Sequence, residues 1–312
     1  MDEIEQLNRK FQGKTEFAIN AYADMSPKEF RETMLMPRRA APVFEKERLF
    51  NVEVKGYLPQ SFDWTDKGVV TSVKNQGTVG TCWAFSTIGN IEGQWAMQGN
   101  ILTDLSVEQV VDCDSTKDPA NDRADCGVFG GWPYLAYQYI KKVGGIEPEV
   151  RYPYCSGNGG CYPCPAPGYN KTLCGPAVPS CLKNESCHAK LDPGKFIAGL
   201  NVTDWKAIDK NETLIAFALM KLGPLSVAFD ASLLQFYHKG IYDPPLCSKT
   251  ELDHAVLMVG FGEDKELFKE KPYWKIKNSW GSKWGESGYF RILRGKGTCG
   301  INTQVTTAVL AT

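Results

Sequence analysis

The chain has 312 residues, of which 43% are hydrophobic, and its formal net charge is −1. This size and composition are sufficient for a full hydrophobic core and predict one large domain or two subdomains. The near-zero charge argues against nucleic acid or an anionic membrane as a partner, and no apolar run reaches the ~18 residues that a membrane span needs.

The N-terminal segment, residues 1–57, is charged and contains helix-like runs. In DMSPKEFRETML, Ser26 is a candidate N-cap, Pro27 takes the first helical position and Glu29 completes a capping box. The following MPRRAAPVFEKERLF, with two prolines and a basic pair, predicts an extended connector. The opening MDEIEQLNRK lacks the apolar core of a signal peptide, so we expect that such a peptide was lost from this chain.

Apolar residues at helical intervals predict helices in the first two thirds of the chain, over Cys82–Met97, Ser106–Val111, Trp132–Lys142 and Glu212–Leu222. After residue 223 the pattern changes to short β-rich segments separated by glycines: PLSVAFD, HAVLMVGFG, PYWKIKNSW and GYFRIL. The change predicts an α+β architecture with two lobes and a cleft between them.

Eleven cysteines are many for a cytosolic protein, and their odd number leaves one free if ten form disulfides. The insert between Cys155 and Cys187 has no usable periodicity and predicts a loop module stapled by disulfides. Four Asn-x-Ser/Thr sequons favour the secretory route and glycosylation, at Asn170, Asn184, Asn201 and Asn211. A metal site at Cys161 and Cys164 is a weaker alternative, because no second Cys-x-x-Cys pair follows.

Cys82 lies between a glycine-rich stretch and the start of a predicted helix. Unpaired N–H groups and the helix dipole at such a position stabilise a thiolate, which is the nucleophilic form of cysteine. The alternative is a buried structural cysteine or a disulfide.

A thiolate nucleophile needs a base, and the chain has three histidines. His188 lies in the cysteine-rich insert and His238 lies near a turn. His254 opens a strand, where an imidazole can be held rigidly toward a cleft. Asn278 follows another strand and could orient that ring, with tryptophans close behind it. Taken singly, each residue has a structural alternative, a strand-end hydrogen bond or a turn.

Taken together, the segments around these residues resemble the papain-like cysteine peptidases, which include the lysosomal cathepsins: QGTVGTCWAF, LDHAVLMVGFG and YWKIKNSWGSKWGESGYF. The resemblance implies a helical left lobe and a β-barrel-like right lobe. It makes Cys82 the nucleophile, a thiolate paired with protonated His254, which then protonates the leaving amine and activates water. Asn278 would orient the ring, and Gln76 would stabilise the oxyanion together with the Cys82 N–H.

The same resemblance implies a peptide-binding cleft. Gly130 and Gly131 would let a substrate backbone run close to the protein. The pocket for the side chain two residues before the scissile bond would be mostly apolar, lined by Trp132, Pro133, Ala228, Leu252 and Gln304, with Asp253 beside it. Trp284 would lie on the leaving-group side.

IEQLN and AINAYAD resemble the end of the family's propeptide helix and the motif after it, with Ala18 in place of the usual glycine and Tyr22 in place of the commoner phenylalanine. We therefore expect residues 1–57 to be a partial inhibitory propeptide, with RRAAPVFEKERLF crossing the active site. Cleavage is expected near Tyr57–Leu58, favoured by acid. The peptidase domain would be 58–312, with a mainly helical lobe at 58–200, including the insert 155–187, and a mainly β lobe at 201–312.

One departure from the family concerns the disulfides. Val79 stands where the family has a cysteine, which leaves Cys126 without its usual partner. Family pairing implies Cys113–Cys187 and Cys247–Cys299, and we expect Cys126 to join a cysteine of the insert. The rest cannot be paired from sequence alone: Cys155, Cys161, Cys164, Cys174 and Cys181. The insert itself has three open roles: a partner surface, a stability clip or a limit on the cleft.

The expected function is that of a cysteine endopeptidase made as a zymogen, with no metal and no cofactor. Its expected partners are protein or peptide substrates, its own propeptide in cis and cystatin-like inhibitors, and it is expected to be a monomer that is lysosomal or secreted. Two alternatives stay open. One is a catalytically silent binding or inhibitory homologue, although such homologues usually lose the Cys or the His. The other is a recruitment protein that acts through its insert.

Overall fold

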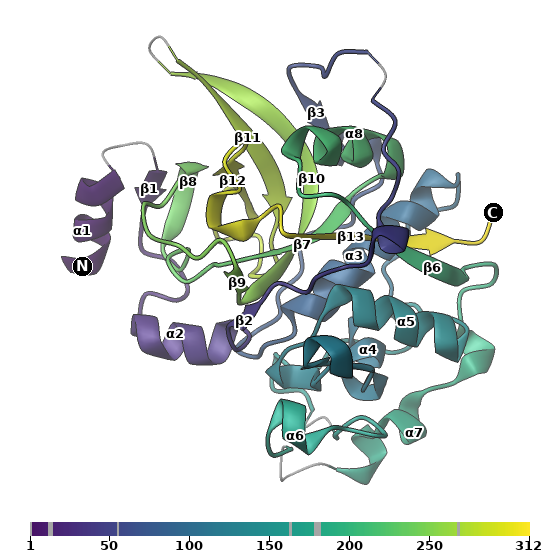
Figure 1. Cartoon of the computed structure of the whole chain (residues 1–312). Coiled ribbons are helices and arrows are strands. Elements are labelled where there is room, and N and C mark those ends of the chain that lie inside the picture. Colours follow the sequence, from purple (N-terminus) through teal and green to yellow (C-terminus); the bar gives the residue numbers. More distant parts are fainter. Residues whose placement is uncertain (1, 12–14, 55, 162–163, 178–181, 267–268) are drawn as a thin grey trace.

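Two lobes of different composition lie side by side in the structure, a computed structural model (Figure 1). It describes residues 2–11, 15–54, 56–161, 164–177, 182–266 and 269–312. One lobe is mainly helical and the other is built around a large sheet. The α+β, two-lobed architecture expected from the sequence is confirmed.

The helices of the described chain are α1 Asp2–Phe11, α2 Pro27–Met34, α3 Cys82–Met97, α4 Val107–Cys113, α5 Pro133–Val143, α6 Lys171–Cys174, α7 Cys187–Lys190 and α8 Glu212–Leu222. Of these, α3, α4, α5 and α8 begin and end within two residues of the predicted bounds. The capping box at α2 is formed, since the Ser26 and Glu29 side chains each accept from the other residue's backbone N–H. The short helix α6 lies in the insert and α7 begins at its last residue, Cys187, so the insert is less irregular than predicted. Among the described helices, none has both the length and the apolar character needed to cross a bilayer.

Within the described residues, one nine-stranded sheet has the order β1-β8-β12-β11-β10-β7-β13-β6, with β3 paired to β10. Its pairs are antiparallel except β12 with β8. Two small ladders, β2–β9 and β4–β5, complete the strands. The bounds are β1 Thr15–Phe17, β2 Arg39–Ala40, β3 Phe62–Asp63, β4 Lys117–Asp118, β5 Arg123–Ala124, β6 Val202–Ala207, β7 Leu225–Phe229, β8 Tyr237–Tyr242, β9 Glu251–Leu252, β10 His254–Glu266, β11 Lys269–Lys277, β12 Tyr289–Leu293 and β13 Gln304–Leu310.

Helix α3 lies between the lobes and sets the position of Cys82, its first residue. It contacts β7, β10 and β13 on the sheet side, and α4 and α5 on the helical side. Most of its residues between Cys82 and Gly93 are buried, the polar Ser86, Asn90 and Glu92 among them, as expected for a helix that packs against an element on both sides. The start of α3 is thus fixed where the two lobes meet.

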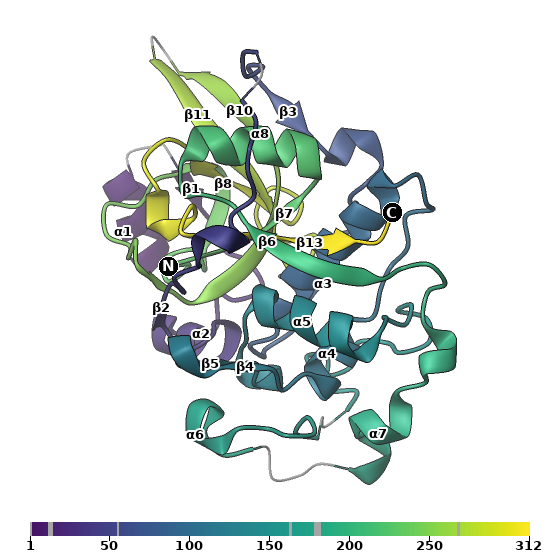
Figure 2. The same cartoon turned by 45° about the vertical axis from the view of Figure 1, so that its right-hand side comes forward.

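The N-terminal segment is packed into both lobes rather than attached loosely to one. Phe30, Met34 and Leu35 belong to the apolar cluster of the β lobe, whereas Met36 belongs to that of the helical lobe. Figure 2 shows α2 beneath the sheet, and in Figure 1 β2 follows α2 toward the centre. Residues 34–41, which we call the strap, therefore pass from one lobe to the other.

The expected disulfides Cys113–Cys187 and Cys247–Cys299 are present. Cys126 pairs with Cys174, which ties the insert to the helical lobe as predicted. Cys155 pairs with Cys161, and Cys164 is also in a disulfide, so the metal reading of Cys161 and Cys164 is wrong. Cys181 lies outside the described residues. The one free cysteine in the described part of the chain is Cys82.

The two insert disulfides differ in the length of the loop they close. The Cys126–Cys174 bond joins residues 48 apart in sequence and the Cys155–Cys161 bond joins residues 6 apart. In the chain-entropy view the longer loop restricts the unfolded chain more, by about 2 kcal/mol. Replacing Cys126 and Cys174 by alanine should therefore lower the free energy of unfolding by about 2 kcal/mol more than replacing Cys155 and Cys161. Urea denaturation of the two double variants checks this, and equal losses would contradict it.

Candidate active site

The Cys82 sulfur lies buried at the junction of the two lobes. The Ala255 N–H of β10 donates to its Sγ at 3.4 Å. Since Ala255 belongs to the sheet and Cys82 to α3, this contact joins the two lobes at the sulfur. The helix start and the strand start predicted from the sequence are thus brought together.

His254 opens β10 and lies next to the residue that contacts the sulfur. Its Nε2 is 2.8 Å from the Asn278 Oδ1, and its ring stacks on Trp280 with centroids 4.7 Å apart. The Nδ1 is buried and has no hydrogen-bond partner, which leaves this nitrogen for the thiol. His188 and His238 are exposed and play no part in this arrangement.

Asn278 and Gln76 are held by the residue that follows Asn278. The Ser279 N–H donates to the Asn278 Oδ1 at 2.9 Å, and the Ser279 hydroxyl donates to the Gln76 Oε1 at 2.7 Å. Ser279 therefore orients both side chains, a role that sequence reasoning missed. Its place directly after Asn278 is the one sequence signal that could have indicated it.

The Gln76 side-chain amide is already bonded to the strap. Its Nε2 donates to the Met34 carbonyl at 3.1 Å and to the Val79 carbonyl at 2.7 Å. Met34 is the last residue of α2 and the first of the strap. A main-chain carbonyl of the N-terminal segment thus accepts from the amide that the resemblance assigns to the oxyanion.

The strap is bound through its backbone, as an extended peptide would be. The Met36 N–H donates to the Asp253 carbonyl, and the Ala41 N–H donates to the Thr250 carbonyl, both at 2.8 Å. Between them Arg39 and Ala40 form β2, which pairs with β9. Met34 contacts Gln76 and Met36 contacts Gly131, so the covering segment begins a few residues before the predicted RRAAPVFEKERLF, whose first residues also lie in the cleft.

The glycine pair predicted to border the cleft lies under the strap. The Gly131 N–H donates to the Met36 Sδ at 3.4 Å. A Cβ atom at Gly131 would lie 2.5 Å from the Trp83 ring, and Gly130 has a φ of 117°, so both positions favour glycine. The pair therefore allows the close approach that the sequence predicts.

The residues predicted to form the apolar pocket come from both lobes. Ala228 pairs with Ala255 on one side and Gln304 on the other. Met36, Trp132, Ala228 and Leu252 belong to one buried cluster, Pro133 is buried at the start of α5, and Gln304 is buried with both amide atoms unpartnered. This arrangement is compatible with a mostly apolar pocket that has a polar floor.

Trp284 lies one layer behind the position expected for it. Its ring meets the Trp280 ring edge-on, with centroids 4.9 Å apart, and its indole N–H donates to the Gln235 carbonyl. Trp280 makes the contacts with the N-terminal segment, with centroids 6.0 Å from Tyr22 and 5.2 Å from Phe30. The surface on that side is therefore formed by Trp280.

Burial shifts the pKa values of both side chains of the candidate catalytic pair. It raises the pKa of the Cys82 thiol to about 12, against the opposing Ala255 N–H contact. It also lowers the pKa of His254 to about 4, against the Asn278 hydrogen bond. Both shifts favour the uncharged thiol and imidazole, so the thiolate–imidazolium pair expected from the resemblance is disfavoured while the strap covers the site.

The insert supports the loop that carries Gln76. The Tyr154 hydroxyl, just before the insert, donates to the Gln76 carbonyl at 2.7 Å. A Cβ atom at Gly157 would lie 1.6 Å from the same oxygen, so only glycine allows this close packing. The first residues of the insert therefore lie against the back of the Gln76 loop.

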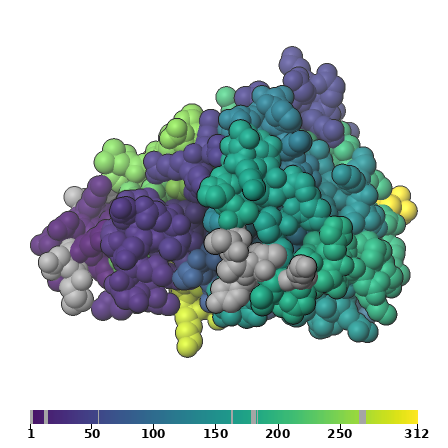
Figure 3. Space-filling view, turned by 90° about the horizontal axis from the view of Figure 1, so that it is seen from below, coloured from purple at the N-terminus to yellow at the C-terminus, as the bar shows by residue number. Residues whose placement is uncertain are grey.

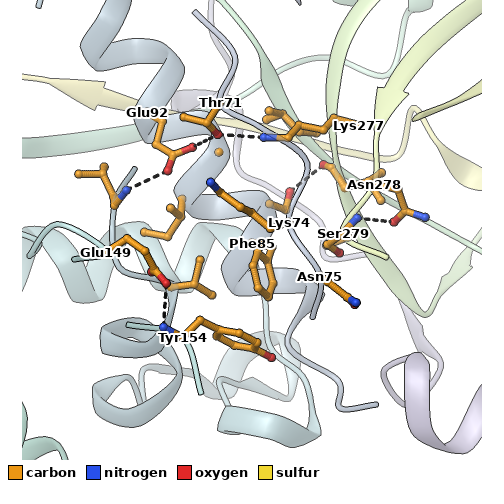
Figure 4. Close-up of a pocket in the computed structure, with 18 residues that line it drawn as sticks. Thr71, Lys74, Asn75, Phe85, Glu92, Glu149, Tyr154, Lys277, Asn278 and Ser279 are labelled. Carbon is orange, nitrogen blue, oxygen red and sulfur yellow. Dashed lines mark hydrogen bonds between the residues drawn. The ribbon is translucent and has the colours of Figure 1, made fainter. Parts of the chain in front are cut away.

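A cavity of about 210 Å³ lies behind the catalytic residues, between α3 and the ends of β10 and β11 (Figure 4). The Lys277 ammonium donates to the Thr71 hydroxyl at 2.9 Å, which donates to the Glu92 carboxylate at 2.6 Å. Burial lowers the pKa of Lys277 to about 8 and raises that of Glu92. These charges satisfy one another, and Cys82 and His254 do not line the cavity.

The predicted glycosylation sites are accessible. Asn184, Asn201 and Asn211 are exposed and Asn170 is half-buried. Asn170 and Asn211 also cap α6 and α8 through their Oδ1 atoms. Since a glycan would be attached to the side-chain nitrogen, all four stay candidates.

Comparison with known proteins agrees with this geometry. The sequence pattern described as "Papain family cysteine protease" matches residues 58–309. The chain is 37% identical to cathepsin F of Drosophila melanogaster over 99% of its own length, and 36% identical to cysteine proteinase 15A of Pisum sativum over 98%. It spans 45% of the fly protein and 77% of the pea protein.

The similar solved structures include proforms. Digestive procathepsin L 3 of the Tenebrio molitor larval midgut superposes with a TM-score of 0.75 and 31% identity, covering 99% of this chain and 88% of that one. A recombinant stem bromelain precursor gives a TM-score of 0.72 and 30% identity, covering 100% and 88%.

Proposed function

Because this chain belongs to the papain family of cysteine proteases, we propose that it is a cysteine endopeptidase whose residues 1–57 hold it inactive. One observation carries the proposal. A backbone carbonyl of the chain's own strap, that of Met34, already accepts from the Gln76 amide, beside a free cysteine and a His–Asn pair. The site thus binds a peptide in the covered state. The proposed peptidase domain is 58–312, with lobes 58–200 and 201–312.

The proposed reaction follows from the positions of four side chains. Cys82 Sγ attacks the scissile carbonyl carbon and forms a tetrahedral oxyanion, which the Gln76 amide and the Cys82 N–H stabilise. His254 gives its proton to the leaving amine, and an acyl-enzyme remains. His254 then takes a proton from a water molecule, whose oxygen attacks the acyl carbon; the thiolate leaves, the acid product is released, and the thiolate–imidazolium pair is restored. Asn278 holds the imidazole ring in its orientation during both steps.

Activation requires removal of the strap. Once water reaches the site, the desolvation that favours the uncharged pair is relieved, and the thiolate–imidazolium pair can form. We place the cleavage near Tyr57–Leu58, where Tyr57 is fully exposed and accessible to a second protease molecule. Incubation at about pH 4–5 followed by mass spectrometry tests this, and full activity with an intact N-terminus would reject it.

Arg38 is the strap residue that makes activation sensitive to acid. Its guanidinium contacts the Asp230 carboxylate at 3.0 Å and the Asp253 carboxylate at 3.4 Å. Burial raises the pKa of Asp253 to about 7, and Arg38 opposes that rise. The buried Asp253 carboxyl is therefore more stable in its protonated form, and its own contribution to the stability of the covered state grows as the pH falls. The Arg38 contact has the opposite dependence, because only the ionised carboxylate attracts the guanidinium, and it is lost as the pH falls through about 7.

Replacing Arg38 by glutamine should therefore speed strap opening by about tenfold near pH 8 but only about threefold near pH 5, a modest effect because the guanidinium is partly exposed. Arg39→Gln is the matched control, since Arg39 bonds to the Leu173 carbonyl, whose acceptor strength does not titrate. The rate of Cys82 alkylation in the full chain measures opening. Equal pH dependence in the two variants would refute the role of Arg38.

The test of the proposed function is titration of the acid-treated chain with an epoxide thiol trap. Labelling of Cys82 with matching loss of peptide hydrolysis is the expected result. Labelling of a chain that hydrolyses no peptide would instead favour a silent binding homologue. The disulfides and accessible sequons support a lysosomal or secreted protein, which we propose acts as a monomer on protein substrates and binds cystatin-like inhibitors.

A further inference from the structure

The cysteine-rich insert reaches the substrate side of the molecule through helix α6. A small hollow of about 40 Å³ remains between the strap, the glycine pair and this helix. Its walls include Met36, Arg39, Gly130, Trp132, Leu173 and Cys174. Viewed from below, the purple N-terminal segment lies against the teal insert (Figure 3). The insert therefore borders the same cleft as Gly130 and Trp132.

One side chain of the strap crosses this cleft from the β lobe to the insert. The Arg39 backbone pairs with Leu252 in the β2–β9 ladder. The Arg39 Nη2 donates to the Leu173 carbonyl at 3.0 Å. An arginine held by its backbone on one wall is thus bound by its guanidinium on the other.

The acceptor is covalently fixed relative to the cleft. Leu173 directly precedes Cys174, which is bonded to Cys126. The Cys126 N–H in turn donates to the Gly130 carbonyl at 2.8 Å. The carbonyl of Leu173 is therefore tied through one disulfide and one hydrogen bond to the glycine pair along which a substrate backbone would run.

The backbone of the bound segment also has a fixed donor in this part of the cleft. The Arg123 guanidinium stacks on Trp132, 5.3 Å from the ring centroid, and donates to the Ala40 carbonyl at 2.6 Å. Arg123 is the first residue of β5, which pairs with β4 and lies beside α6 in the fold. The insert side thus supplies an acceptor for a side chain, while Arg123 supplies a donor for a backbone.

We propose that α6 of the insert is the outer wall of the substrate cleft and that the Leu173 carbonyl binds an arginine or lysine side chain at the third residue before the scissile bond. This rests on the proposed function. The second residue would fill the apolar pocket at Trp132, and the next residue outward faces Leu173 once the strap has left. Three roles were open for the insert: a partner surface, a stability clip or a limit on the cleft. The proposal assigns it the last of these.

The experiment uses the acid-activated chain and three peptides that differ only at the third residue before the scissile bond: arginine, norleucine or glutamate. The wild type should prefer arginine over norleucine by about five- to twentyfold in kcat/KM, as expected for one charge-assisted hydrogen bond, and should disfavour glutamate. Leu173→Arg, which places a second cation at the acceptor, should abolish the preference for arginine over norleucine. Lys171→Ala, an exposed change on the same helix, should leave the preference intact. A wild type without the preference, or a preference that survives in Leu173→Arg, would overturn the proposal.

A second measurement on the full chain does not depend on catalysis. Alkylation of Cys82 by iodoacetamide reports strap opening, and Arg39→Ala and Leu173→Arg should each speed it by about fivefold, with no further gain in the double variant because both remove one contact. Additive effects would show that the two residues do not interact and would overturn the proposal that α6 forms the outer wall of the cleft. If no peptide is hydrolysed and the epoxide fails to label Cys82, the proposed function fails, while the alkylation data still decide whether α6 binds this arginine.

Discussion

Replacing Cys82 by alanine is expected to lower kcat for peptide hydrolysis by about 10⁵- to 10⁶-fold, the loss found when a covalent nucleophile is removed from a protease. His254→Ala should lose about as much, and the double variant should lose no more than either single one, because nucleophile and base act as a unit. Steady-state kinetics of the acid-activated chain, normalised to protein that has lost its strap, measure this.

His238→Ala is the matched control for these variants. His238 lies exposed in β8, so its loss should leave kcat within about twofold, as for surface substitutions generally. A His254→Ala variant that keeps more than a few per cent of wild-type kcat would remove His254 from the proposed mechanism. Full loss in both histidine variants would instead point to damage to the fold.

The sequence predicted the positions of the candidate catalytic residues better than their ionisation state. Cys82 and His254 could be located because each begins an element whose periodicity is clear, and because the segments around them together resemble one peptidase family. The uncharged state of the pair could not be predicted. It depends on the burial of both side chains in the folded protein, and burial by segments distant in sequence leaves no mark on the residues beside Cys82.

The path of the strap was predicted less well for a related reason. The sequence indicated a crossing by the basic, proline-rich stretch, yet the covering segment begins a few residues earlier, at Met34 to Met36. These apolar residues close the helix α2, and in the sequence they resemble the end of an amphipathic helix. They enter the cleft because both lobes offer them buried apolar surface, and that surface exists only after the lobes have met.

The insert shows the limit of pattern reasoning most clearly. Its prolines and glycines hide α6, which is a single turn capped by the Asn170 side chain. The resemblance still predicted that Cys126 would form a disulfide with a cysteine of the insert, because Val79 stands where the family has the usual partner cysteine. Which cysteine it joins depends on where α6 packs, and this requires the fold.

Replacing Gln76 by alanine is expected to reduce kcat by about 10²- to 10³-fold, the effect of removing one side-chain donor from an oxyanion hole. The Gln76 Nε2 already donates to a backbone carbonyl, that of Met34, so the amide is aimed at the position where a carbonyl oxygen binds. KM should change little, since the donor matters most when the oxygen carries charge.

Alkylation of Cys82 by iodoacetamide separates this role from a structural one. That reaction forms no tetrahedral oxyanion, so its rate in the acid-activated Gln76→Ala chain should stay within about threefold of wild type while hydrolysis falls by ~10²–10³. Ser279→Ala removes the hydrogen bond to the Gln76 Oε1 but keeps the Gln76 amide as a donor. Its kcat for peptide hydrolysis should fall by about tenfold, as expected for the loss of a positioning residue. If alkylation and hydrolysis fall together in Gln76→Ala, the amide supports the loop rather than the oxyanion, and the Met34 carbonyl does not mark the place where the substrate oxygen binds.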